Sequence, residues 1–228
     1  MTFIRPLFQP TEMHVLITAG PTYEPLDPVR FLGNRSTGKM GYALAEAFAA
    51  EGAEVTLISG PSALPDPASP RIRTVRVETA AQMFAAAAAM AAAADVWVFA
   101  AAVADYRPVQ VATEKIKKAG ETLTLELVKN VDIAATLGQG KRAEQFAVGF
   151  ALETTNELAH AQDKLRRKNF NLVVLNSLRD AGAGFGHDTN KVTVLDAAGQ
   201  IVNFELQSKA EVARGLVRLI LARLSPTP

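Results

Sequence analysis

Short apolar runs alternate along this chain with segments whose apolar positions recur at helical spacing. The first pattern indicates buried strands and the second indicates amphipathic helices. The predicted strands are residues 14–18, 53–60, 74–77, 97–103, 122–128, 146–152 and 171–176. The predicted helices run from 36 or 37 to about 52, from 80 to 94, from 131 to 137, from 155 to 168, and from 209 onward. This alternation predicts an α/β, Rossmann-like fold with a mainly parallel sheet covered by helices on both faces.

Local signals refine the ends of these elements. Two runs, 191–196 and 201–206, flank Ala-Ala-Gly-Gln and predict a C-terminal β-hairpin. The three prolines between Pro21 and Gly33 predict a long loop without regular structure, and the glycines from 182 to 186 predict a flexible loop. Residues 122–128 are predicted as an extra strand near a lysine-rich loop. The predicted helix caps are Thr79 with Gln82, Asn130, Thr154 with Glu157, and Ser208 with Glu211.

The domain organisation follows from the same pattern. Residues 1–12, with Pro6 and Pro10, predict an irregular N-terminal arm, and residues 13–228 predict a single nucleotide-binding α/β domain. A chain of 228 residues can bury a full core, and we find neither an internal repeat nor a linker.

Composition narrows the chemistry. The formal net charge of +1 does not favour a nucleic-acid partner, so any charge that binds phosphate must be local. The absence of cysteine excludes disulfides, thiolate zinc sites and a cysteine nucleophile, and the three scattered histidines offer no metal-ligand spacing. No apolar run approaches the roughly 20 residues of a membrane span. We therefore expect a soluble cytoplasmic protein that makes no contact with a membrane.

The most informative stretch runs from Thr18 to Gly41, where glycines, small residues and cations gather before a predicted helix. Backbone N–H groups at a helix start bind phosphate when small residues allow close approach. Residues 33–40 match the P-loop pattern except at Met40, where a P-loop has Ser or Thr, and they do not directly follow a strand. An ordinary loop before a well-capped helix is the alternative. The predicted phosphate or substrate loop comprises Gly20, Ser36, Thr37, Gly38 and Lys39.

Further polar residues follow other predicted strands. Asp105, Glu153 and Asn176 come at strand ends, where ligands bind in open parallel sheets, although Asp105 could equally serve a turn. The small residues 100–102 would let a flat ring approach the backbone. Lys115, Lys117 and Lys118 could meet a triphosphate or form a solvated segment. Lys164 and Lys168, four apart on a predicted helix, mark either an anion site or an exposed face.

Several motifs together carry a resemblance to a known family. ITAGPTYEPLDPVRFLGNRSTGKMGYALA, AAVADYRP, EKIKK, LVKNVDI, VGFALET and the Lys164/Lys168 pair resemble phosphopantothenoylcysteine synthetase, also called phosphopantothenate cysteine ligase, of the bacterial CTP-dependent type. The resemblance runs in order from about Met13 to the last helix. In bacteria this enzyme is commonly fused behind a flavin-dependent decarboxylase. We expect no such domain and no flavin here, and a separate phosphopantothenoylcysteine decarboxylase is a candidate partner.

The resemblance implies an acid–amino acid ligase of coenzyme A biosynthesis. Its substrates would be 4'-phosphopantothenate, CTP and L-cysteine, with Mg2+ as cofactor, and it would act as a homodimer whose subunit contact includes the extra strand. By the family pattern, Asn34 acts on the acyl-cytidylate, Lys115 stabilises phosphate charge, and Arg30 matches a further catalytic position. The implied CTP-binding residues are Ala101, Asp105, Lys115, Val131, Asp132, Ile133, Ala134, Phe150, Lys164 and Lys168. The metal ligands stay unassigned.

Two positions depart from the family pattern. Residues 131–134 read VDIA where PDIV is usual, and residues 34–41 read NRSTGKMG where NHSSGKMG is usual. Neither changes the reaction class, but both leave the preference for CTP over ATP open.

Two rivals belong to other classes. A dinucleotide-dependent reductase would show GxGxxG after the first strand, which AGPTYEP does not. A nucleotide-binding regulatory module without chemistry would need the base-binding residues but not Asn34.

Overall fold

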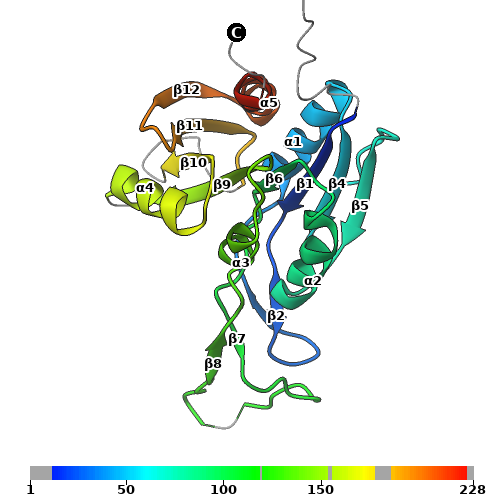
Figure 1. Cartoon of the computed structure of the whole chain (residues 1–228). Helices are drawn as coiled ribbons and strands as arrows, with labels where there is room; N and C mark the ends of the chain where they lie inside the picture. Colours follow the sequence, from blue (N-terminus) through cyan, green and yellow to red (C-terminus); the bar gives the residue numbers. More distant parts are fainter. Residues whose placement is uncertain (1–11, 119, 154–155, 178–185, 225–228) are drawn as a thin grey trace, which may run out of the picture.

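The computed structural model describes residues 12–118, 120–153, 156–177 and 186–224. An eight-stranded sheet organises it, in the order β12-β11-β10-β9-β6-β1-β4-β5 (Figure 1). The strands from β10 to β5 are parallel, whereas β11 and β12 form an antiparallel hairpin at one edge. The bounds are β1 (His14–Ala19), β4 (Glu54–Ser59), β5 (Ile72–Arg76), β6 (Val96–Phe99), β9 (Phe146–Glu153), β10 (Leu172–Ser177), β11 (Thr189–Asp196) and β12 (Ile201–Ser208).

Helices cover both faces of this sheet. Strand side chains alternate between the two faces, so that Val15 and Ile17 join one core cluster and Leu16 joins the other. The first cluster packs under α1 (Lys39–Ala50) and α5 (Lys209–Leu224). The second packs under α2 (Ala80–Ala91), α3 (Ile133–Gln139) and α4 (Glu157–Arg167). The predicted fold class, including the C-terminal hairpin, is confirmed.

The proline-containing loop is more regular than predicted. Residues Tyr23–Pro25 form β2 and pair with β3 (Phe31–Gly33), and the rings of Tyr23 and Phe31 stack with centroids 3.7 Å apart. The prediction of a loop without regular structure was wrong because Pro25 occupies a strand end, a position that tolerates the missing N–H.

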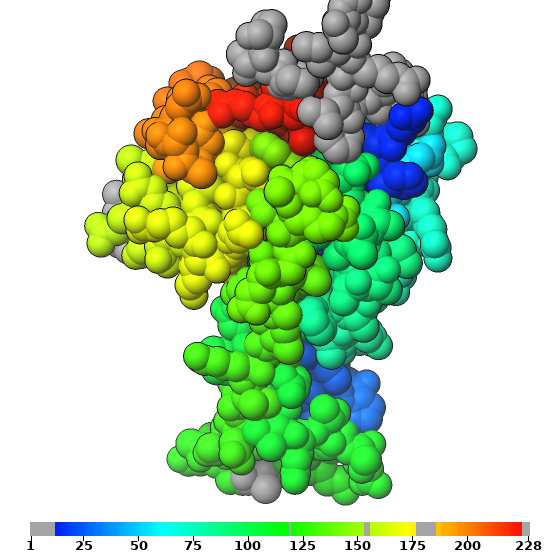
Figure 2. All heavy atoms as spheres, viewed as in Figure 1, coloured from blue at the N-terminus to red at the C-terminus, as the bar shows by residue number. Residues whose placement is uncertain are grey.

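The segment from Tyr106 to Lys129 leaves the main body, and we call it the arm (Figures 1 and 2). Its two ends, β7 (Tyr106–Pro108) and β8 (Leu127–Lys129), pair with each other in an antiparallel ribbon. The predicted strand over residues 122–128 was therefore wrong in extent, because the strand covers only Leu127–Lys129. The extra strand near the lysine segment exists, but it belongs to the arm and not to the main sheet.

Three of the predicted caps can be compared with the structure. Thr79 and Gln82 form the predicted capping box, and the predicted Ser208–Glu211 hydrogen bonds are present. Helix α3 is capped by Asp132 instead of Asn130, whose side chain bonds to Ala104 and Arg107. Thr154 and the glycines before Gly186 lie outside the described residues.

Candidate active site

A cavity of about 290 Å³ opens where β1, β6, β9 and β10 end. This is the edge of a parallel sheet at which ligands bind. Most of the sequence-predicted site residues line the cavity, namely Ser36, Thr37, Gly38, Lys39, Ala101, Asp105, Val131, Asp132, Ile133, Ala134, Phe150, Lys164 and Lys168, together with Asn176. Residues from six separate stretches of chain therefore meet at one place.

One wall of the cavity is the small-residue segment 100–104. The N–H of Ala100 donates to the Thr18 carbonyl at 3.1 Å, and the N–H of Ala102 donates to the Gly20 carbonyl at 2.8 Å. Gly20 has a φ of 76° and lies so close to Gly60 that a Cβ would be 3.2 Å from the Gly60 carbonyl oxygen. Gly20 therefore supports this wall from behind, and it does not line the cavity as predicted for the phosphate loop.

A second wall is the start of α1, a helix of 12 residues. Gly38 takes the N-cap position with a φ of 83°, and its N–H donates to the Ser36 hydroxyl at 3.3 Å. Lys39 lies here too and forms an ion pair with Asp188 at 2.6 Å. The helix N-terminus and the Lys39 ammonium are features that attract an anion, while Asp188 offsets part of the lysine charge.

The opposite side of the cavity is formed by α3 and α4. Asp132 accepts from the N–H of Ala135 at 3.1 Å and forms an ion pair with Lys168 at 2.9 Å. Burial raises the pKa of Asp132, but the Lys168 hydrogen bond, the Ala135 N–H and the nearby positive charges hold this pKa below its ordinary value. Lys168 is thus anchored at the cavity by a carboxylate that stays ionised at neutral pH.

Aromatic residues form the floor. Phe150 lines the cavity from β9, and Phe99 and Phe170 lie beside each other with ring centroids 5.8 Å apart. Gly149 makes room for this arrangement, because a Cβ there would lie 2.0 Å from the Phe170 ring. The floor and the alanine wall together give the apolar surroundings that suit a flat ring.

The three predicted catalytic residues do not line the cavity. Asn34 comes nearest, since its Nδ2 donates to the carbonyls of Ala102 at 2.9 Å and Val103 at 3.2 Å, both on the wall. Arg30 pairs with Asp27 where the β2–β3 loop contacts the segment of the arm between β7 and β8. Lys115 lies on the arm itself, with an exposed side chain. The structure thus gathers the predicted nucleotide-binding residues apart from Lys115, but not the predicted catalytic set.

Sequence reasoning missed several residues of this site, among them Asn190 and Lys209. Asn190 is 1% exposed, and its Oδ1 has no hydrogen-bond partner among the described residues. Lys209 is buried, and its ammonium donates to the His187 carbonyl. Burial, reinforced by the charge of Lys39, lowers the pKa of Lys209. Neither residue belongs to a local motif, because each reaches the cavity through long-range packing.

The cavity offers limited means of holding a metal. Among the described residues, His, Asp and Glu side chains form no group of three or more that could bind a metal ion. Asp105 and Asp132 both line the cavity, and Asp132 is already engaged with Lys168. Such a donor set fits Mg2+, which typically takes one or two carboxylates together with substrate phosphates.

The helices give no sign of membrane insertion. Across the described part of the chain, none is long and apolar enough to cross a bilayer.

Taken together, a helix N-terminus, lysines, an alanine wall and an aromatic floor form a cavity on an α/β sheet that suits a phosphate-bearing ligand with a flat ring. Residues 11–224 match the family model described as the DNA/pantothenate metabolism flavoprotein C-terminal domain. The chain belongs to this family.

Curated relatives and a solved structure agree with that membership. A "Cysteine/Cysteine sulfinic acid decarboxylase" from an unknown prokaryotic organism is 49% identical over 207 residues, covering 91% of this chain and 57% of the relative. The coenzyme A biosynthesis bifunctional protein CoaBC of Haemophilus influenzae is 42% identical over 215 residues, covering 94% and 53% respectively. The crystal structure of the C-terminal domain of CoaBC is 42% identical with a TM-score of 0.80, covering 95% of this chain and 98% of that one. The chain thus spans about half the length of the curated relatives it matches.

Proposed function

We propose that this chain is a phosphopantothenate cysteine ligase of coenzyme A biosynthesis that acts in the cytoplasm. The observation that carries the proposal is the agreement between the cavity and the family pattern. Nearly all of the residues expected to bind the nucleotide line one cavity, and the chain matches almost the whole solved C-terminal domain of CoaBC. The activity in the name of the decarboxylase relative is not carried over, because the chain covers only 57% of that protein, whereas it covers 98% of the solved C-terminal domain of CoaBC.

The proposed reaction has two steps. A carboxylate oxygen of 4'-phosphopantothenate attacks the α-phosphorus of CTP, the bond to the β-phosphate oxygen breaks, and pyrophosphate leaves. The amine of L-cysteine then attacks the acyl carbon of the acyl-cytidylate, loses a proton, and displaces CMP as the bond from the acyl carbon to the phosphate oxygen breaks. No protein nucleophile is needed, so catalysis depends on positioning and on stabilising phosphate charge.

The cavity supports this chemistry through its separate surfaces. The alanine wall and Phe150 suit the base, while the start of α1 and the lysines of α4 suit the phosphates. We assign Asp105 a role in binding the nucleotide together with its Mg2+ ion. The Mg2+ ion would neutralise negative charge on the leaving pyrophosphate. Asn34 stands at the edge of the wall, where it can reach the acyl group as it leaves the nucleotide.

The arm supports a homodimer as part of the proposal. It carries large apolar side chains that are exposed, and Figure 2 shows it as a narrow extension of the body. These residues are Tyr106, Val109, Val111, Leu123, Leu127 and Val128. Several large exposed apolar side chains on one projection are typical of a contact with another chain. We therefore assign the arm to the subunit contact, which light scattering at several concentrations tests.

Pyrophosphate release tests the function directly. Purified protein would receive Mg2+, 4'-phosphopantothenate and either CTP or ATP, with and without L-cysteine. We expect release that requires phosphopantothenate, occurs faster with CTP, and yields the amide only when cysteine is present. Release with ATP alone would correct the nucleotide, and nucleotide binding without release would favour a binding module.

A further inference from the structure

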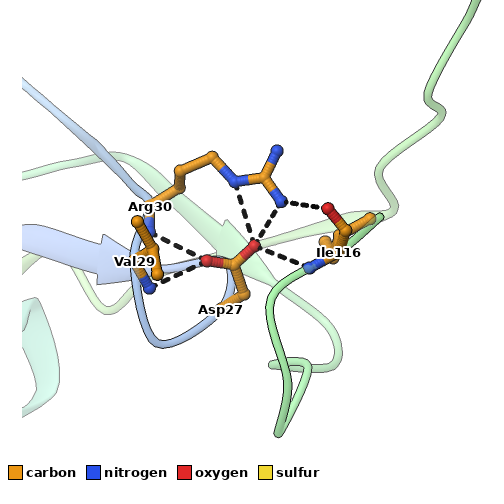
Figure 3. Close-up of polar contacts among 4 residues, drawn as sticks. All are labelled: Asp27, Val29, Arg30 and Ile116. Atoms are coloured by element: carbon orange, nitrogen blue, oxygen red, sulfur yellow. Dashed lines mark hydrogen bonds and ion pairs between the residues drawn. The ribbon is translucent and has the colours of Figure 1, made fainter. Parts of the chain in front are cut away.

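The Asp27 carboxylate is buried where the arm meets the loop between β2 and β3 (Figure 3). Its Oδ1 accepts from the N–H groups of Val29 at 2.8 Å and Arg30 at 2.9 Å. Its Oδ2 accepts from the Arg30 guanidinium, with Nε at 2.9 Å, and from the N–H of Ile116 at 3.1 Å. One side chain therefore joins two segments that are 89 residues apart in sequence.

Two further hydrogen bonds hold the same segments together. The Arg30 Nη2 donates to the carbonyl of Ile116 at 2.9 Å, so Ile116 is bound through both of its backbone groups. The N–H of Ala112 donates to the Leu26 carbonyl at 3.0 Å. Lys115 lies between these two attachment points, and its own side chain is exposed.

The two carboxylate oxygens of Asp27 have different roles. Accepting N–H groups two and three residues onward is the ordinary way in which Asp shapes its own turn, and Oδ1 alone does this. Oδ2 faces the arm instead, where it meets the guanidinium and the Ile116 N–H. The hydrogen bond from Arg30 is the largest influence holding the pKa of Asp27 far below its ordinary value. The carboxylate thus stays ionised at every pH at which the enzyme would work.

We propose that Asp27 is a positioning residue, which anchors residues 112–116 to the Arg30 loop and thereby fixes where Lys115 presents its ammonium. The proposal rests on the proposed function, in which Lys115 stabilises phosphate charge. A lysine has a long flexible side chain, so the position of its charge depends on how firmly its backbone is held. Lys115 lies on an arm that projects from the body, so its backbone depends on the contacts that Asp27 and Arg30 make with Ile116. Catalysis by positioned charge is sensitive to small displacements of that backbone.

Asp27→Asn tests this role, because the amide can keep the Oδ1 bonds while its Nδ2 cannot accept from Arg30 or Ile116. We expect pyrophosphate release to slow by about tenfold or more. The dissociation constant for CTP measured by calorimetry should change less than twofold, because Asp27 does not line the cavity. Amide hydrogen exchange at Ile116 should accelerate. An unchanged release rate together with unchanged exchange at Ile116 would overturn the proposal.

A double-mutant cycle shows whether Asp27 acts through Lys115. Residues that act as a unit are not additive, so Asp27→Asn should cause little further loss in a Lys115→Gln background. The same tenfold loss in both backgrounds would mean that Asp27 acts elsewhere, and the proposal would fail. Asp66→Asn is the matched control, since Asp66 forms an exposed ion pair with Arg76 at 2.6 Å away from the arm. It should alter neither the release rate nor the exchange at Ile116.

A second variant covers the case in which Asp27→Asn does not fold. Ile116→Pro removes the N–H that donates to Oδ2 and alters no residue of the loop that contains Asp27 and Arg30. Slower release with unaltered CTP binding supports the anchor, and a wild-type rate contradicts it. Failure of the proposed function can be distinguished from failure of the anchor. If the proposed function is wrong, the wild-type protein releases no pyrophosphate. Amide exchange at Ile116 in Asp27→Asn still reports whether Asp27 anchors the arm.

Discussion

The cavity and the arm are held in place by different kinds of interaction. The cavity lies at the edge of an eight-stranded sheet, with two hydrophobic clusters packed beneath its walls. The arm has one ribbon of two three-residue strands, and polar contacts with the β2–β3 loop, above all those of Asp27, hold the segment between these strands. Packed cores define positions closely, whereas exposed segments open at low free-energy cost. We infer that the rigid cavity binds the nucleotide, and that the less constrained arm places the positive charge of Lys115 near the phosphates.

The largest expected effect comes from the arm. Lys115→Gln should slow pyrophosphate release by about a hundredfold, since removing one group that stabilises transition-state charge typically costs this much. Nucleotide affinity should fall far less, because Lys115 does not line the cavity. Rapid-quench kinetics and calorimetry measure the two quantities. The control is Lys129→Gln, at another exposed lysine of the arm. A wild-type rate for Lys115→Gln would contradict the assignment of binding to the cavity and of phosphate stabilisation to the arm.

The edge of the wall should give the next effect. Asn34→Asp replaces an amide donor by a carboxylate that faces the carbonyl oxygens of Ala102 and Val103, so repulsion should displace the side chain. We expect product formation to fall by about tenfold to a hundredfold, with the acyl-cytidylate accumulating and CTP binding retained. Trapping the intermediate with and without cysteine checks this. Asn203→Asp, on an exposed strand position, is the control. Normal product formation without excess intermediate would count against a role for Asn34.

A substitution in the cavity floor should affect stability. Gly149→Ala places a Cβ 2.0 Å from the Phe170 ring, and overpacking of this kind typically costs about 1–3 kcal/mol. For a chain of this size each kcal/mol lowers the melting temperature by roughly 2–4 °C. Gly140→Ala is the control, because its Cβ would meet nothing nearer than 3.8 Å at a negative φ. If the two variants have the same melting temperature, the cavity floor accommodates the added methyl group and the expected overpacking is contradicted.

The sheet could be predicted from the sequence because its strands are apolar runs with a core on both sides. The same reasoning failed on the arm. Residues 122–128 alternate like a half-buried strand, yet Leu123 is 57% exposed, because no surface within the described part of the chain covers it. The β2–β3 ribbon was missed because its prolines were taken to forbid pairing, although one of them only ends a strand.

Most of the cavity-lining residues could be predicted because they lie in short motifs at strand ends and helix starts, where topology brings them together. Asn190 and Lys209 could not, since their places in the cavity depend on how β11 and α5 pack against α1. Asp27 belongs to the recognised loop, but its contact with Ile116 spans 89 residues and has no local signal.

The smallest expected effect concerns the Asp132–Lys168 pair on the cavity rim. Asp132→Asn keeps a side chain that caps α3 well but removes the ion pair, whose carboxylate side chain is 44% exposed. The cost should be below about 1 kcal/mol at pH 7, because water screens an exposed pair. The pKa of Asp132 is lowered in the folded state, so its contribution is present above the unfolded pKa of about 3.9 and is lost as pH falls through the lower folded pKa. Urea unfolding of wild type and variant should therefore differ at pH 7 and converge in acid.

The control for that experiment is Asp163→Asn. Asp163 and Arg167 both lie on α4 and form a longer ion pair of 3.5 Å. This variant should change stability less than Asp132→Asn at neutral pH, because both side chains of the pair are 60% exposed. A difference between wild type and Asp132→Asn that persists undiminished in acid would show that the cost comes from the cap of α3 and not from the charge. The cavity rim would then be held by backbone geometry alone, and Lys168 would be free to turn its charge toward the nucleotide.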